Sequence, residues 1–124
     1  MEFAPSQSIY LQIADHLCDR ILSGALKEGE RIASVRELAE ASQVNPNTVL
    51  RAYGYLQELG IIRNQRGIGY FVDPEAREKT RSLKRANFIK RELPRVFRTL
   101  DLLEMSCEDL KRLYEQRTRK ESKS

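Results

Sequence analysis

The chain has 124 residues, a formal net charge of +4, and 40% hydrophobic against 32% charged residues. This length accommodates one ordinary domain or a small domain with a helical extension, and the composition is typical of a folded, helix-rich protein. Residues 1–8 lack the basic start and apolar run of a signal peptide, and no window approaches the roughly 18 apolar residues of a membrane span. We therefore expect a cytoplasmic protein with no membrane partner.

The first part of the chain predicts two helices. Apolar residues recur at three- and four-residue spacing over residues 8–23, which is the pattern of a helix with one buried stripe. Residues 31–32 are expected to form a short extended segment before the second helix. Ser34 is followed three residues later by Glu37, a capping-box pattern, so the second helix is predicted over residues 34–42.

A tight turn leads into a third helix. Asn45 is a suitable N-cap and Pro46 suits the first helical position, so this helix is expected over residues 46–59. Its apolar residues are predicted to form a buried stripe, namely Val49, Ala52, Tyr53, Leu56 and Leu59. The opposite face is then expected to expose Asn47, Thr48 and Arg51 near the start of the helix, with Tyr55 as a further candidate.

Two extended runs follow the third helix, one over residues 61–64 and one over residues 68–72. The short segment that joins them contains Arg66 and Gly67. Runs of this length, separated by a few residues that include glycine, are typical of a β-hairpin. The sequence therefore predicts a hairpin with a basic tip.

Beyond Pro74 the sequence becomes strongly helical. One apolar seam runs along this tail, formed by Leu83, Ile89, Leu93, Val96, Phe97, Leu100 and Leu103. A small domain cannot cover so long a seam, so we expect it to pack against the same seam of a second chain and form a homodimer. Pro94 should kink or split the helix near residues 91–93. Ser106 followed by Asp109 predicts the start of a short last helix.

Charge is distributed unevenly along the chain. Residues 1–72 carry seven basic against eight acidic side chains, whereas residues 73–124 carry fifteen against ten. Within the tail, the nine basic residues of 77–98 are opposed by only two acidic ones. Such a run is either the solvated face of a helix or a segment that contacts phosphates, and the sequence leaves both interpretations open.

The order of these elements predicts the fold class. Two short helices joined by a tight turn and followed by a hairpin are the plan of a winged helix-turn-helix. We therefore expect a mainly α protein with a small β-wing. Its domains are predicted to be a winged helix-turn-helix DNA-binding domain over residues 1–74 and a helical dimerisation tail over residues 75–124. The predicted partner is a double-stranded DNA operator.

Three separated motifs resemble one family. The order IYLQIADHLCDRILSGALKEGERIASVRELA, then NPNTVLRAY, then LGIIRNQRGIGYFV is similar to the GntR family of bacterial transcription regulators over residues 9–72. The NPNTV turn and the short tail resemble its YtrA-type branch. This resemblance implies a homodimer that represses an operon, often one for an ABC transporter, and implies no large effector-binding domain.

The chain departs from the family pattern at two positions. Ala33 stands where the family usually has proline before the second helix. Leu50 stands where many members have arginine, and here the arginine follows one residue later as Arg51, as in the YtrA-type branch.

The third helix is expected to enter the major groove of DNA. Asn47 suits adenine, Thr48 suits a thymine methyl group or a phosphate, and Arg51 suits guanine or a phosphate. These three residues are the candidate base readers.

Other candidate DNA contacts come from the second helix and the hairpin. Arg36, at the start of the second helix, should meet the phosphate backbone, as the family resemblance also implies. Arg66 and Gly67 suit the minor groove, where arginine finds a strong negative potential and glycine lets the backbone approach closely. Because the first 72 residues are nearly neutral, we expect Arg36, Arg51, Arg63 and Arg66 to cluster on one face.

Nothing in the sequence predicts catalysis. Cys18 and Cys107 form no Cys-x-x-Cys pair, and we expect both to be buried as small apolar side chains. His16 is the single histidine, so no second imidazole is present to hold a metal, and there is no glycine-rich phosphate loop. We therefore expect no enzyme, no cofactor and no metal site.

Two functions remain open from the sequence. The leading hypothesis is a sequence-specific, homodimeric repressor on an inverted-repeat operator. The alternative is an architectural, non-specific nucleic-acid-binding protein that acts through the basic residues of 77–98. The sequence identifies no small-molecule effector: the aromatic residues Phe88, Phe97 and Tyr114 fit either a ligand site between tail helices or plain core.

Overall fold

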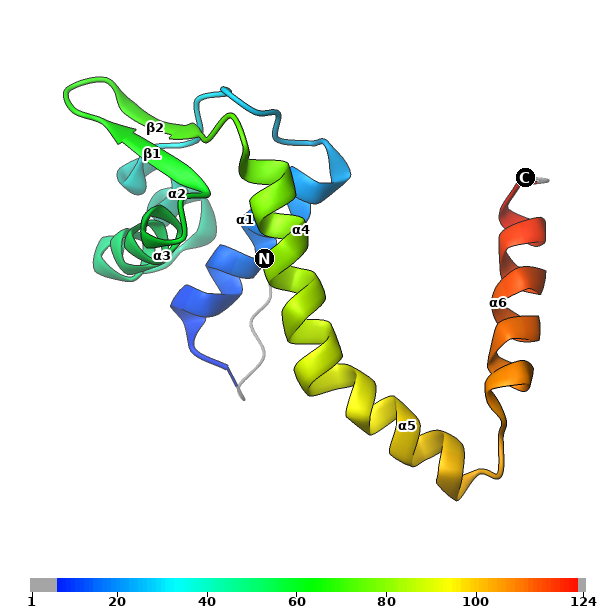
Figure 1. Ribbon diagram of the computed structural model, residues 1–124. Helices are drawn as coiled ribbons and strands as arrows, with labels where there is room; N and C mark the ends of the chain where they lie inside the picture. Colours follow the sequence, from blue (N-terminus) through cyan, green and yellow to red (C-terminus); the bar gives the residue numbers. More distant parts are fainter. Residues whose placement is uncertain (1–6, 123–124) are drawn as a thin grey trace. The chain divides into compact units, whose positions relative to one another are not determined.

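The computed structural model describes residues 7–122, with side chains up to residue 118. It is mainly helical with one two-stranded antiparallel sheet, which confirms the predicted fold class (Figure 1). The chain divides into two compact units, residues up to 84 and residues from 85 onward. Within the described residues, no helix combines the length and apolarity needed to cross a membrane.

The first helix, α1, spans Ile9–Ser23 as the periodicity predicts. Its buried stripe consists of Ile13, Ala14, Leu17, Cys18 and Ile21. The helix ends at Gly24, whose φ of +88° is costly for residues with a Cβ, and the Gly24 N–H donates to the carbonyl of Ile21. Burial of each large apolar side chain contributes about 1.5–3 kcal/mol, so this stripe holds α1 against the rest of the unit.

Helices α2 (Val35–Ser42) and α3 (Pro46–Glu58) form the helix-turn-helix, and both caps are made as predicted. Ser34 and Glu37 exchange hydrogen bonds in a capping box, and the Asn45 side chain accepts the Asn47 N–H at 2.8 Å. α3 contacts α1, α2 and β1 (Figure 1). Its four innermost side chains are fully buried, namely Val49, Ala52, Tyr53 and Leu56. Leu59 was expected in this stripe but is 36% exposed, because it follows the last turn of the helix.

The hairpin consists of β1 (Ile62–Gln65) and β2 (Gly69–Val72), with Ile62 opposite Val72 and Gln65 opposite Gly69. The other edge of β2 pairs with the loop that precedes α2, because the Ile32 N–H donates to the carbonyl of Tyr70 at 3.0 Å. The predicted extended segment at residues 31–32 is therefore one isolated bridge rather than a strand. This pairing ties the wing to the start of α2.

The first part of α4 (Ala76–Asn87) packs on the winged-helix unit. Ala76 is fully buried and Leu83 contacts the core cluster. The Lys84 ammonium lies 3.0 Å from the Asp15 carboxylate and 3.8 Å from that of Asp19, both on α1. Burial lowers the pKa of Lys84, but the hydrogen bond and charge of Asp15 outweigh it and raise the pKa overall. Residues 76–84, which the sequence analysis assigned to the tail, thus belong to the first compact unit.

The second unit begins inside this helical stretch. A π-helical segment, Phe88–Glu92, precedes α5 (Leu93–Leu102), and it lies where Pro94 was expected to disturb the helix. Proline lacks an N–H and crowds the preceding turn, which gives the local change of helical register a physical cause. The last helix, α6, spans Cys107–Ser122. Ser106 and Asp109 cap it reciprocally, with N···O distances of 2.9 and 3.1 Å.

The two cysteines have different environments. Cys18 is buried in the core, and desolvation raises the pKa of its thiol to about 11, so it is an inert apolar group as expected. Cys107 is exposed, so the expectation that it is buried was wrong. It is the first residue of α6, and no described part of the chain covers that position.

A buried carboxylate joins the hairpin to α4. Asp73 accepts hydrogen bonds from the Arg63 side chain at 2.8 Å, the Glu75 N–H at 2.9 Å and the Lys79 ammonium at 3.4 Å. Burial raises the pKa of Asp73, but these donors outweigh it and lower the pKa below its ordinary value. The charged form therefore stabilises the fold.

We predict that Asp73→Asn destabilises the protein at pH 7 by about 1 kcal/mol, because the replacement loses two partly exposed ion pairs. Since the pKa of Asp73 is lowered on folding, its stabilisation is complete above the ordinary pKa of 3.8 and is lost as the pH falls through the lowered value. Urea unfolding at pH 7 and pH 3 checks this. The difference between the two proteins should be smaller at pH 3 than at pH 7. Glu75→Gln, at an exposed neighbouring carboxylate, is the control and should have little effect at either pH.

Candidate nucleic-acid interface

The outer face of α3 is fixed by its buried face. With 3.6 residues per turn, burial of Val49, Ala52, Tyr53 and Leu56 directs the side opposite them toward solvent. In the N-terminal half and middle of α3 this side exposes Asn47, Leu50, Arg51 and Gly54, and one turn beyond Gly54 it exposes the carboxylate of Glu58. Thr48, a predicted base reader, is half-buried at the edge of this face. The N-terminal half of α3 therefore presents an amide, a guanidinium and an apolar side chain together.

Arg51 is held by aromatic side chains. Its guanidinium lies 4.0 Å from the centre of the Tyr10 ring, and Tyr10 makes an edge contact with Tyr55 at 6.2 Å. A shallow depression beside these rings also includes Gly54 and Glu58. A cation stacked on an aromatic face has fewer conformations to lose on binding. Sequence reasoning identified Arg51 but missed Tyr10, whose helical spacing indicated only core.

A groove runs between the start of α2 and the hairpin. It is lined by both secondary-structure elements and by the loop before α2, with Arg31, Ser34, Arg36, Asn64, Gly67 and Gly69 among its residues. Two of the predicted contacts, Arg36 and Gly67, are thus brought together in one groove. Arg66 is exposed at the tip of the hairpin next to Gly67. Arg51 lies instead in the depression beside Tyr10.

Arg31 is a groove residue that sequence reasoning did not single out. Its Nε lies 3.0 Å from the point where a Cβ would stand at Gly69, whose φ is +141°. The guanidinium therefore packs directly on the glycine backbone, and a larger residue at position 69 would displace it. The sequence signal was the second glycine of Gly67-x-Gly69, but its partner is 38 positions away, so local spacing does not reveal the contact.

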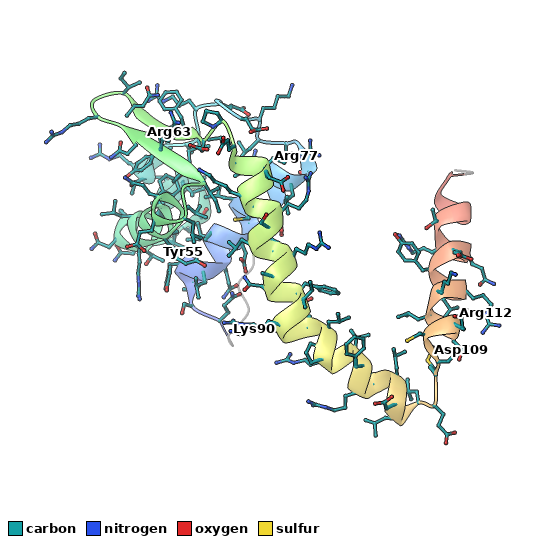
Figure 2. All side chains as sticks on the ribbon, viewed as in Figure 1. Tyr55, Arg63, Arg77, Lys90, Asp109 and Arg112 are labelled. Atoms are coloured by element: carbon teal, nitrogen blue, oxygen red, sulfur yellow. The ribbon has the colours of Figure 1, made fainter. Side chains whose placement is uncertain are left out.

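The arginines of the winged-helix unit differ in their partners. Arg63, labelled on the hairpin in Figure 2, was expected to join the basic cluster; its guanidinium pairs with the carboxylate of Asp73, which directly follows β2, so its charge is matched. Among the described residues, no carboxylate lies within ion-pair distance of Arg31, Arg36 or Arg66. The groove and the hairpin tip therefore keep unneutralised positive charge, which favours contact with phosphates.

The carboxylate of Glu37, in the first turn of α2, is engaged in the helix cap. The hydrogen bonds of Glu37 with the Ser34 side chain and backbone lower the pKa of Glu37, and the charge of Arg31 contributes less. Glu37 is thereby directed at the start of α2 rather than into the groove.

Comparison with known proteins agrees with this geometry. Residues 9–72 match the family "Bacterial regulatory proteins, gntR family". The chain is 43% identical over 75 residues to the uncharacterized HTH-type transcriptional regulator YhcF of Bacillus subtilis, and 42% identical over 72 residues to the HTH-type transcriptional repressor YtrA of the same species. These matches cover 60% and 58% of this chain, but only 62% and 55% of the two relatives.

The likeness to a solved structure extends further along the chain. A putative transcriptional regulator of the GntR family from Bacteroides thetaiotaomicron superposes with a TM-score of 0.77 at 43% sequence identity. The match covers 91% of this chain and 98% of that one, so it includes residues beyond the winged helix.

We predict that Arg31→Gln weakens binding to duplex DNA equally for all sequences and lowers the slope of log K against log salt by about one, since one phosphate contact is lost. Fluorescence anisotropy measures the binding constant at salt concentrations from about 50 to about 300 mM, which gives this slope. Arg20→Gln is the matched control, because Arg20 lies in the last turn of α1 and lines none of the surfaces described above. An unchanged slope for Arg31→Gln would remove Arg31 from the interface.

Proposed function

Because the chain belongs to the gntR family of bacterial regulatory proteins, we propose that it acts as a homodimeric repressor on an operator with inverted half-sites. The similarity to this family makes it a DNA-binding transcriptional regulator and not an enzyme. The observation that carries the proposal is the polar, partly cationic outer face of the N-terminal half of α3, together with the arginines without ion-pair partners that line the groove between α2 and the hairpin. A helix of this size fits the major groove of B-DNA.

In this proposal the N-terminal half of α3 reads bases. Asn47 is assigned to adenine, Arg51 to guanine or an adjacent phosphate, and Thr48 to a thymine methyl group or a phosphate. The exposure of Asn47 and Arg51 supports their assignment, whereas the half-buried Thr48 offers only part of its side chain.

The groove between the start of α2 and the hairpin is proposed to hold the DNA backbone. Arg36, in the first turn of α2, is directed at a phosphate together with Arg31. The exposed Arg66 and Gly67 at the hairpin tip are assigned to the minor groove. Phosphate contacts of this kind set the register of the protein, and base contacts in the major groove then select the sequence.

The proposal of a homodimer rests on apolar side chains that the second unit leaves uncovered. From residue 85 onward, among the described side chains, eight large hydrophobic residues are exposed, namely Phe88, Ile89, Phe97, Leu102, Leu103, Leu110, Leu113 and Tyr114. Exposed apolar surface of this extent is typical of an interface with another protein. A second copy of the chain is the proposed occupant, since closed two-fold dimers are the commonest oligomers.

The residues predicted to form the dimer seam differ in how much surface they offer. Ile89, Phe97 and Leu103 are exposed, while Leu93 and Val96 are half-buried. Leu100 is buried, and Leu83 contacts the core of the winged-helix unit. The first group therefore has the most apolar area available to a partner.

Repression is proposed from similarity to the repressor YtrA of Bacillus subtilis. A dimer seated on an operator would block polymerase by occupancy, which requires no further activity of the protein. The YtrA-type resemblance extends the proposal to an operon that encodes an ABC transporter. A protein with this role acts in the cytoplasm, where the chromosome is.

The first test selects binding sites from a random duplex library with the full chain at about 0.15 M salt, where non-specific binding is weak. We predict an inverted repeat. Arg51→Ala should reduce the preference for the selected site over scrambled DNA by about tenfold, because a bidentate arginine–guanine pair is worth about 1–3 kcal/mol. Anisotropy titrations with both duplexes measure this ratio.

Other outcomes distinguish the alternative function. Bulk binding without any motif would favour the non-specific architectural role, in which the basic residues of 77–98 contact phosphates. Arg85→Gln with Lys90→Gln then tests that segment, because Lys84 is paired with Asp15 and is a poor probe. A selected motif with unchanged discrimination by Arg51→Ala would remove Arg51 from base reading.

We predict that Phe97→Glu converts the protein to a monomer and lowers affinity for the inverted repeat by about 100-fold, because the second half-site then no longer binds as part of the same molecule. Sedimentation equilibrium at micromolar concentration and titration of a single half-site check the two effects. Arg98→Glu is the control for the oligomeric state, since Arg98 is exposed and lies on the side of α5 away from Phe97, Leu100 and Leu103. A dimeric Phe97→Glu protein would contradict the proposed interface.

A further inference from the structure

Leu50 is a large apolar side chain on the outer face of α3. It follows Asn47 by three residues and directly precedes Arg51, so it lies on the side of the helix that the core does not cover. Half of its surface, 51%, is exposed, and it is absent from both the core cluster and the hydrophobic residues packed on that cluster. Leu50 therefore contributes little to the stability of the fold.

The position of Leu50 distinguishes it from other exposed apolar residues of its unit. Among the described residues up to 84, the large exposed hydrophobic side chains are Ile9, Leu50, Leu59 and Ile68. Single exposed hydrophobic residues are common and need no explanation by themselves. Only Leu50 lies in the N-terminal half of α3, beside the proposed base readers. When that half enters the major groove, the exposed part of the Leu50 side chain is within reach of base edges.

Base edges in the major groove differ in polarity. Guanine, adenine and cytosine present hydrogen-bond donors and acceptors there, and thymine alone adds an apolar methyl group. A leucine side chain placed on a polar edge removes water from that edge without returning a hydrogen bond, which is unfavourable. A leucine side chain placed on a methyl group buries apolar area on both partners.

We infer that Leu50 is a specificity-determining residue, which selects thymine at one position of each half-site by contact with its 5-methyl group. This inference rests on the proposed function, because it requires α3 to enter the major groove. It extends that function by naming thymine as the base that the protein selects at one position of each half-site.

The neighbouring arginine supports a division of roles. The Arg51 guanidinium is held over the Tyr10 ring on the α1 side of α3. Leu50 is about 100° away around the helix, so its contact and that of Arg51 fall on different groups of the DNA. The polar and the apolar reader therefore do not compete for one base.

The test uses sites selected by the full-length wild-type protein from the random duplex library. Each thymine of the selected site is replaced singly by deoxyuridine, which lacks only the 5-methyl group. We expect one such replacement per half-site to weaken wild-type binding about fourfold, the ratio that corresponds to one buried methyl group. For Leu50→Ala the same replacement should have no effect, since the apolar contact is already absent.

A second variant and a control complete the design. Leu50→Arg should change the selected base at that position from thymine to guanine, because arginine pairs with the guanine edge. Leu59→Ala is the matched control: it removes an exposed leucine nine residues further along, about 14 Å by the helical rise, and should keep the deoxyuridine penalty. Thermal unfolding of each variant verifies that the fold is kept.

The outcomes separate this inference from the function on which it rests. If the wild type selects a motif but the deoxyuridine penalty persists in Leu50→Ala, or no thymine shows a penalty, the assignment of Leu50 is overturned while the repressor proposal stands. If the wild type selects no motif, the proposed function fails and the inference fails with it.

Discussion

The winged-helix unit depends on burial of one face of α3. Tyr53 lies at the centre of that face, fully buried, and its hydroxyl donates to the carbonyl of Ala33 at 2.6 Å. Its ring meets the edge of Tyr70 on β2 at 4.8 Å. Burial raises the pKa of Tyr53 to about 12, so the hydroxyl remains a donor at neutral pH. One residue thereby connects α3 with the loop before α2 and with the wing, and the three surfaces proposed to meet DNA keep a fixed relation.

Charge pairing explains how the first 72 residues, which are nearly neutral as a whole, still present a positive surface. The carboxylates of Asp15 and Asp19 on α1 are matched by Lys84 on α4, and Asp73 is matched by Arg63. These pairs lie at the packing contacts of α4 and the base of the hairpin. Arg31 and Arg36, which have no ion-pair partner among the described residues, line the groove between α2 and the wing instead. A nearly neutral winged-helix unit thus presents a positive groove to phosphate, because several of its acidic residues are used for internal contacts.

The second unit differs from the first in how little apolar surface it buries. Its helices have sound local signals, including the reciprocal cap of Ser106 and Asp109, but its described residues bury only Leu100 among the large apolar side chains. Helix caps and propensity specify where helices begin and end, yet most of the stability of a helix comes from packing of its apolar face. The tail therefore has the features of a structure that is completed by a partner, whereas the winged helix has a core of its own.

Local signals determined the fold, and long-range contacts determined the details of the site. The capping box at Ser34, the Asn45 cap and the hairpin spacing lie within a few residues of the structures they specify, so the sequence predicted these elements and the outer face of α3. The sequence did not reveal that Arg51 stacks on Tyr10 or that Arg31 packs on a glycine of the wing. Each of these partners is about 40 positions away in the chain. Only the folded core brings them into contact, because side-chain pairing follows distance in space rather than separation in sequence.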